Sequence, residues 1–312
     1  MRVTGIKQGT QEWLQWRHNG IAATDAASIM DANPYASPLD VYFDKVSDTV
    51  KHIEQNAAME WGSRIESLLV NKFAEMHPGI KNLETSKLYA YDKDTYFKAS
   101  LDAEADIDGE HVIIECKTGS STEKWFNPDG TETVPLNYFY QVQWQMLVTG
   151  YRHVFFSVLI NGRDWFERSV TASDKAQADM IETCNAMHER INSKSQPEPS
   201  KLHAASDLKL LTANHSVDDD DTPDVSEDIY GRYTKAKSLA DTYNLLVEQL
   251  KLEIAEALSG HKCLMFGNKK FAMIASRKSG VKLSDALVKA QFPEVYSKCL
   301  IATAPSKYLK VM

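Results

Sequence analysis

Two acids and a lysine around a short turn are the residues of this sequence best placed to do chemistry. Asp108-Gly109 predicts a two-residue hairpin, because both central positions of a type I′ turn need the positive φ that Asp and Gly tolerate. In that register Asp102 lies across from Glu115, with Cβ atoms about 5 Å apart, and Lys117 follows on the same face. Opposed carboxylates repel, so the pair predicts a bound divalent cation that offsets the repulsion.

The cation that suits this pair is Mg²⁺, for which Mn²⁺ would substitute. Hard cations bind one or two carboxylates together with water and phosphate oxygens. We expect Asp102 and Glu115 to be ligands, with the backbone carbonyl of Cys116 as a third, and Lys117 to orient or deprotonate a water or stabilise developing negative charge. The alternative is an ordinary surface ion pair of Glu115 and Lys117. The apolar run at residues 112–114 favours the metal site, because it is typical of a strand buried on both faces.

A second constellation lies near the start of the chain. Thr24 is predicted to be the N-cap of a short helix, and a hydroxyl with free N–H groups at a helix N-terminus forms a phosphate cradle that Arg17 would complete. The alternative is that Thr24 only caps the helix and Arg17 is only a surface cation. The nearby aromatic residues Trp13, Trp16 and Tyr35 would either fill the core or a subunit contact, or stack on end bases.

Composition narrows the class of protein. The 312 residues carry a net charge of −8, so any contact with nucleic acid must be local. The four cysteines have no CxxC spacing, which predicts neither a zinc site nor an iron–sulfur cluster. With no signal peptide and no long apolar run, we expect a soluble cytoplasmic protein that does not bind membranes.

The order of predicted elements indicates an α/β (α+β) domain in residues 1–194, with a mixed central sheet flanked by helices. Thr10 and Ser37-Pro38 are typical of helix starts, and a longer helix over residues 58–77 carries Glu66. The remaining predicted elements are strands at 87–91, 96–107 and 111–118, a helix at 136–149, a hairpin of 154–160 with 163–171, and a helix at 174–191.

The rest of the chain has a different character. Residues 195–228 are rich in Pro and Asp and predict an acidic linker. Residues 229–312 predict an accessory region: a long helix whose apolar residues follow a coiled-coil-like seam, two strands around Gly267-Asn268, a short helix from Ser284 and a last strand from Ser306. This region has no catalytic constellation of its own, so we expect it to serve interactions.

Five blocks in consistent order resemble the PD-(D/E)xK nucleases, and within them the lambda exonuclease and YqaJ-type viral recombinases. One block is the hairpin described above. The other four are Q-G-T-Q-E-W-L-Q-W-R at 8–17, G-I-A-A-T-D-A-A at 20–27, W-G-S-R-I-E at 61–66 and Y-Q-V-Q-W-Q at 140–145.

The resemblance implies a restriction-endonuclease-like core and a role for each matching residue. Lys117 and its two acids would be catalytic, Glu66 would support them or bind a second metal, and Gln141 would hydrogen-bond to water or DNA near Lys117. Gln143 and Gln145 are weaker candidates. Arg17 and Thr24 would bind the 5′ phosphate of the recessed strand.

The function implied is a Mg²⁺-dependent 5′-to-3′ exonuclease on linear double-stranded DNA, which leaves 3′ overhangs for phage-type recombination. Relatives imply a trimeric ring, a single-strand annealing protein as partner and, for a viral source, the host cytoplasm. Two alternatives stay open. The same site would serve an endonuclease, which needs no grip on a terminal phosphate, or the chain would be a non-catalytic DNA-binding or interaction protein.

Overall fold

The computed structural model describes residues 1–50, 56–214, 224–275, 285–291 and 293–299, which lie in two compact units. Of the described residues, 1–50 and 56–214 belong to unit 1, and 224–275, 285–291 and 293–299 belong to unit 2. The predicted last strand from Ser306 lies outside the described residues. Within them, no helix combines the length and the apolar character needed to cross a membrane.

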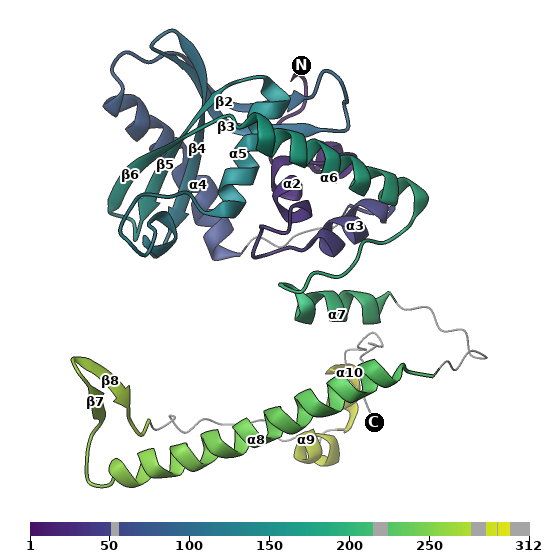
Figure 1. Ribbon diagram of the computed structural model, residues 1–312, viewed down its shortest axis with the longest axis vertical. Coiled ribbons are helices and arrows are strands. Elements are labelled where there is room, and N and C mark those ends of the chain that lie inside the picture. Colours follow the sequence, from purple (N-terminus) through teal and green to yellow (C-terminus); the bar gives the residue numbers. More distant parts are fainter. Residues whose placement is uncertain (51–55, 215–223, 276–284, 292, 300–312) are drawn as a thin grey trace. The chain divides into compact units, whose positions relative to one another are not determined.

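A six-stranded mixed sheet forms the centre of unit 1 (Figure 1). The strands lie in chain order, and all neighbours are antiparallel except β4 and β5, which are parallel and joined through helix α5. The strands are β1 Arg2–Val3, β2 Lys81–Ala90, β3 Lys98–Ile107, β4 Glu110–Gly119, β5 His153–Ile160 and β6 Asp164–Thr171.

Helices cover the sheet on both faces. One core cluster joins α4 to the sheet through Val70, Phe73 and Ile114, and a larger cluster joins the sheet to α2, α3, α5 and α6. The helices of unit 1 are α1 Gln11–His18, α2 Ala23–Ile29, α3 Pro38–Val46, α4 Ala57–Met76, α5 Leu136–Thr149, α6 Asp174–Ser193 and α7 Ala204–Ala213, with a 3₁₀ turn at Glu123–Trp125. The predicted fold class, a mixed sheet flanked by helices, is confirmed.

The hairpin of β3 and β4 has the register predicted from its turn. Asp108 and Gly109 adopt φ values of 52° and 85°, and the pairs run from Ile107↔Glu110 to Ala103↔Ile114. The second predicted hairpin, β5 with β6, also forms around its Asn-Gly turn. This register places Asp102 next in line across from Glu115.

Two of the three predicted N-caps are confirmed. Thr10 accepts the N–H of Trp13 at 3.3 Å, and Ser37 accepts that of Asp40 at 3.0 Å. The prediction for Thr24 is wrong, because α2 begins one residue earlier, and its first turn is fixed by the carboxylate of Asp25, which accepts the N–H of Ala22 at 3.0 Å. The Thr24 hydroxyl is therefore not used as a cap.

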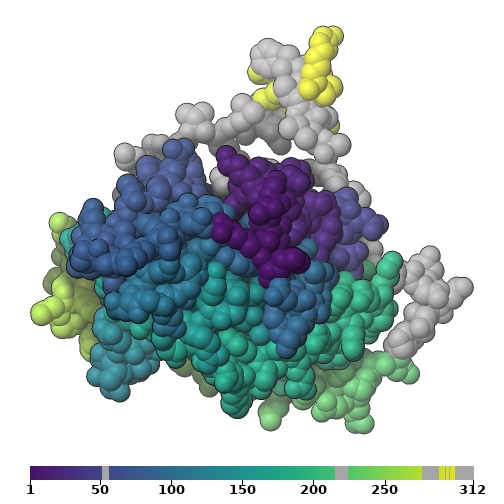
Figure 2. Space-filling model, turned by 90° about the horizontal axis from the view of Figure 1, so that it is seen from above, coloured from purple at the N-terminus to yellow at the C-terminus, as the bar shows by residue number. Residues whose placement is uncertain are grey.

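Two more elements of unit 1 differ from the prediction. Strand β1 pairs with β2, and Figure 2 shows the N-terminal residues (purple) on the surface of unit 1. Part of the predicted linker is helix α7, whose fully buried Asp207 accepts the Ser37 hydroxyl at 2.6 Å and the Ser200 N–H at 2.7 Å. The polar composition that suggests a linker thus includes residues that hold α7 against α3.

Unit 2 contains the predicted long helix and hairpin. Its elements are α8 Glu227–Ala257, β7 Leu264–Phe266, β8 Lys269–Ala272, α9 Asp285–Gln291 and α10 Pro293–Cys299; α10 was not predicted. No residue of α8 is buried, and seam residues such as Tyr243 and Val247 are exposed.

Candidate active site

Strand β4 brings Glu115 and Lys117 together. The Lys117 ammonium donates to Glu115 Oε1 at 2.6 Å and to Gln141 Oε1 at 3.1 Å, and Glu115 is 2% exposed. From β3, the carboxylate of Asp102 accepts the backbone N–H of Cys116 at 2.8 Å. The predicted acids and lysine therefore lie in one cluster, which we call the Lys117 cluster.

Helix α5 presents one face to this cluster. Gln141 donates to Glu115 Oε1 at 2.5 Å, Gln145 donates to Glu115 Oε2 at 2.8 Å, and the Lys117 ammonium lies 4.6 Å from the ring centre of Tyr138. Residues three and four apart share a helix face, so the spacing of 138, 141 and 145 places all three side chains on one face of α5. The sequence prediction favoured Gln141 and did not use this spacing, which would also have indicated Tyr138 and Gln145.

Gln143 lies on another side of α5 and has a structural role. Its amide donates to the Thr171 carbonyl at 2.8 Å and accepts the Ser173 N–H at 2.8 Å, which fixes the connection between β6 and α6. It therefore makes no contact with the Lys117 cluster.

Burial and like charge raise the pKa of two acids at the cluster, Asp102 and Glu66. The pKa of Asp102 is well above its ordinary value because of burial and the neighbouring charges of Glu115 and Glu66. The pKa of Glu66, from α4, is raised by burial and by Glu115. Burial lowers the pKa of Lys117, but Glu115 and Asp102 outweigh it and the net shift is upward. The cluster thus combines three acids with one ammonium.

The donor set of the cluster fits a hard divalent cation. No three His, Cys, Asp or Glu side chains of the described residues converge as metal ligands, so Asp102 and Glu115 would be completed by a backbone carbonyl and water, as Mg²⁺ sites commonly are. The buried Oε1 of Gln145 has no hydrogen-bond partner among the described residues. Burial raises the pKa of the Cys116 thiol, which opposes a thiolate ligand.

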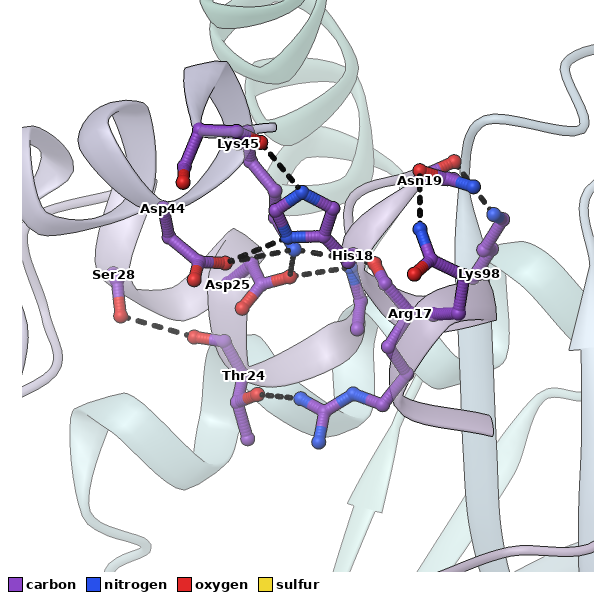
Figure 3. A network of polar contacts seen from close by, with 12 residues as sticks. Arg17, His18, Asn19, Thr24, Asp25, Ser28, Asp44, Lys45 and Lys98 are labelled. Carbon is purple, nitrogen blue, oxygen red and sulfur yellow. Dashed lines mark hydrogen bonds and ion pairs between the residues drawn. The ribbon is translucent and has the colours of Figure 1, made fainter. Parts of the chain in front are cut away.

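The second predicted constellation also forms. Arg17 donates to the Thr24 hydroxyl at 2.8 Å, and its guanidinium lies 4.9 Å from the ring centre of Trp13 (Figure 3). Among the described residues, no carboxylate lies within ion-pair distance of Arg17, so its charge is available to an anion.

The acids beside Arg17 are already paired. Lys45, whose side chain is 3% exposed, lies 2.9 Å from Asp25 and 3.5 Å from Asp44 (Figure 3). Burial raises the pKa of Asp25, but Lys45 and Arg17 outweigh it and hold the pKa below its usual range. Asp25 therefore stays ionised and bound to Lys45.

Two lysines hold the backbone that carries Arg17. Lys45 donates to the Arg17 carbonyl at 3.1 Å, and Lys98 donates to the carbonyls of Trp16 and Asn19, each at 2.6 Å. Burial and the charge of Lys45 lower the pKa of Lys98 to about 8. These contacts fix the C-terminal end of α1.

Arg17 and Thr24 line a cavity of about 460 Å³. Its wall also includes Ser28, Asn33, Tyr35 and Lys45, from α2, α3 and the loop between them. We call this cavity the Arg17 pocket.

Comparisons with known proteins find one family model and one curated relative that match part of this chain. Residues 12–152 match the YqaJ-like viral recombinase domain. The chain is 30% identical over 174 residues to the uncharacterised protein YqaJ of Bacillus subtilis. The aligned region covers 54% of this chain and 52%, about half, of that protein.

Two solved structures are similar to this chain at low sequence identity. An alkaline exonuclease from Laribacter hongkongensis is 20% identical and superposes with a TM-score of 0.48. The match covers 60% of this chain and 94% of the exonuclease chain. A phage-related exonuclease from Haemophilus somnus is 9% identical, covers 58% and 97%, and has a TM-score of 0.44. The family model and the relative confirm the resemblance found in the sequence: residues 12–152 of this chain are similar to the YqaJ-like viral recombinase domain.

Proposed function

We propose that this protein is a metal-dependent nuclease that degrades linear double-stranded DNA from its 5′ ends and leaves 3′ overhangs for phage-type recombination. The observation that carries the proposal is the Lys117 cluster, in which the charges of Asp102, Glu115 and Glu66 interact and the ammonium of Lys117 bonds to Glu115. A buried excess of negative charge is expensive unless a cation offsets it. The recombinase domain supports action on DNA.

The residues of the cluster have distinct tasks in this proposal. Mg²⁺ would be held by Asp102, Glu115 and the Cys116 carbonyl, and when bound it would polarise the scissile phosphate and lower the pKa of water. Mn²⁺ would substitute. The raised pKa of Lys117 keeps its ammonium protonated at neutral pH, which favours donation to a developing oxyanion over proton abstraction. Gln141 orients that ammonium.

The Arg17 pocket supplies the preference for an end. An arginine without a carboxylate partner among the described residues, next to a hydroxyl, suits a phosphate monoester. The pocket therefore favours an exonuclease that grips the 5′ phosphate over an endonuclease. A ring-shaped oligomer and an annealing protein are further expectations that rest on the family alone.

Digestion of a linear duplex labelled separately at each strand terminus tests this function. The wild type, Lys117→Ala and the exposed control Lys175→Ala would be compared with and without Mg²⁺, on duplexes with a 5′ phosphate or a 5′ hydroxyl. We expect Mg²⁺-dependent release of nucleotides from the 5′ end, faster with the phosphate, in the wild type and the control, and none in Lys117→Ala.

Circular duplex serves as a second substrate in the same assay. Cutting of the circle would favour the endonuclease. No cleavage of either substrate by the wild type with Mg²⁺ or Mn²⁺ would overturn the enzyme and favour the interaction protein.

A further inference from the structure

An exposed aromatic ring stands at the wall of the Arg17 pocket. Tyr35 is 79% exposed and lines the same cavity as Arg17 and Thr24. The sequence left open whether this ring fills the core or a subunit contact, or stacks on bases, and its exposure excludes the core. A flat apolar face beside an unpaired guanidinium matches the two parts of a nucleotide, a base and a phosphate.

The backbone of Tyr35 is held in place although its ring is free. Its N–H donates to Asn33 Oδ1 at 3.1 Å, the Asn33 amide donates to the Ser28 hydroxyl at 2.8 Å, and that hydroxyl donates to the Thr24 carbonyl at 3.1 Å. Three hydrogen bonds thus connect Tyr35 to the residue that contacts Arg17. The backbone that carries the ring is therefore fixed relative to the pocket.

Successive phosphates of a DNA strand are separated by one nucleoside. If the 5′ phosphate occupies the Arg17 pocket and the first phosphodiester lies at Lys117, the first nucleoside begins at the pocket, whose wall includes the exposed ring of Tyr35. The cavity has room for more than a phosphate, since about 460 Å³ falls within the range of about 300–1,000 Å³ of small-molecule sites.

We propose that Tyr35 stacks on the base of the 5′-terminal nucleotide and so positions the first phosphodiester at the Lys117 cluster. This inference rests on the proposed function and deepens it. It makes Tyr35 a positioning residue whose ring is needed and whose hydroxyl is not.

The test pairs a change in the protein with a change in the DNA. Linear duplexes with a 5′ phosphate would carry either a normal or an abasic 5′-terminal nucleotide, and kcat/KM for release of that nucleotide would be measured for both. We expect the wild type to prefer the normal substrate by about tenfold, the effect of one base stacking on an aromatic ring. Tyr35→Ala should lower this preference to near one, whereas Tyr35→Phe should keep it.

A matched control and a binding readout complete the test. Tyr230→Ala removes a tyrosine that is also exposed, at 61%, but lies on α8 and does not line the cavity, so it should keep the tenfold preference. In EDTA, where no cleavage occurs, the fluorescence of a 5′-terminal 2-aminopurine should fall on binding to the full-length wild type and to Tyr35→Phe, but not to Tyr35→Ala.

The outcomes separate this inference from the function on which it rests. Degradation from the 5′ end that depends on Lys117 and the 5′ phosphate, with a base preference unchanged by Tyr35→Ala, would refute the stacking and leave the nuclease in place. If the wild type cleaves nothing, the fluorescence experiment decides: the same quenching with wild type and Tyr35→Ala would refute the stacking.

Discussion

The Lys117 cluster and the Arg17 pocket are built from the same residue types, but their charges are balanced in opposite ways. In the Lys117 cluster three acids share one ammonium, and burial with mutual repulsion raises the pKa values of Asp102 and Glu66. In the Arg17 pocket Lys45 pairs with Asp25 and Asp44, the carboxylate of Asp40 accepts the N–H of Ser37, and the pKa of Asp25 is lowered.

The difference indicates what each site is built to bind. A cluster with excess carboxylate costs folding free energy that a cation would return. A pocket whose acids are already paired leaves an arginine to bind an anion. Removing an acid should therefore have opposite effects on the stability of unit 1 in the two places.

The largest expected effect follows from Asp102→Asn. Loss of a metal ligand should lower cleavage by about 10³-fold, and loss of a repelling charge should stabilise the protein in EDTA by about 1 kcal/mol at pH 8. Because the pKa of Asp102 is raised on folding, this gain should grow with pH. Cleavage assays and denaturant unfolding in EDTA measure the two effects.

The surface variant Asp164→Asn, at a side chain that is 53% exposed, serves as the control and should change neither quantity. A loss of stability in EDTA for Asp102→Asn would mean that Asp102 is a structural acid, and the contrast between the two sites would fail.

The opposite result is expected for Asp25→Asn. Here the substitution breaks a buried ion pair and leaves the ammonium of Lys45 with its longer contact to Asp44 and its hydrogen bond to the Arg17 carbonyl, so we expect a loss of about 3 kcal/mol. Because the pKa of Asp25 is lowered, the stability that this acid provides is present above its unfolded pKa and is lost as pH falls through the lower folded value.

Urea unfolding at pH 7 measures this effect. Asp44→Asn is the matched comparison, since that acid is more distant from Lys45 and more exposed, and it should cost less. Equal losses for the two variants would contradict the assignment of Asp25 as the main partner of Lys45.

Arg17→Met should separate binding from stability. Arg17 has a hydroxyl and a ring as its contacts but no ion-pair partner among the described residues, so unfolding free energy should change by less than about 0.5 kcal/mol. The preference for a 5′-phosphorylated over a 5′-hydroxyl end should fall about tenfold. The exposed variant Arg64→Met should keep the preference; an unchanged preference in Arg17→Met would mean that the phosphate binds elsewhere.

Local rules predicted the hairpins and the Lys117 cluster, whereas Arg17 and Thr24 were assigned to one site from a helix cap that does not form and from the family resemblance. The Asp108-Gly109 turn fixed the register that brings Asp102 to Glu115, because a two-residue turn leaves one way to pair the strands. The C-terminal hairpin around Gly267 followed from the same rule. Short-range spacing is reliable where one turn or one helix face sets the geometry.

Long-range contacts explain what the sequence did not reveal. The N-terminus of α2 was misplaced because Asp25 competes with Thr24 as the capping group, and α7 was missed because the partner of Asp207 lies 170 positions away at Ser37. The pairing of Lys45 with Asp25 likewise joins two helices. None of these follows from composition or periodicity.

Helix α8 illustrates a further limit of pattern reading. Its seam has the apolar spacing of a packed helix, and α5 has a buried face of similar residues, yet no residue of α8 is buried. Periodicity predicts an apolar stripe, but whether the stripe meets a partner depends on the rest of the fold. The seam thus supports the expectation of an interaction region without identifying its partner.

The smallest expected effect concerns Lys98, which holds the backbone of Arg17. Its pKa of about 8 is below that of an unfolded lysine, about 10.4, so between these values the unfolded chain binds more protons and stability rises with pH. Lys98→Met lacks this titration, so the stability of the wild type relative to the variant should increase from pH 7 to pH 10. Because the ammonium is partly solvated, we expect only about 1–3 °C in relative melting temperature. Lys87→Met, at a lysine of β2 whose side chain is 24% exposed and makes no such carbonyl contacts among the described residues, should show no such slope. A difference that shrinks with pH would mean that the charged form of Lys98 is the stabilising one, and that the end of α1 is held by charge as Asp25 is.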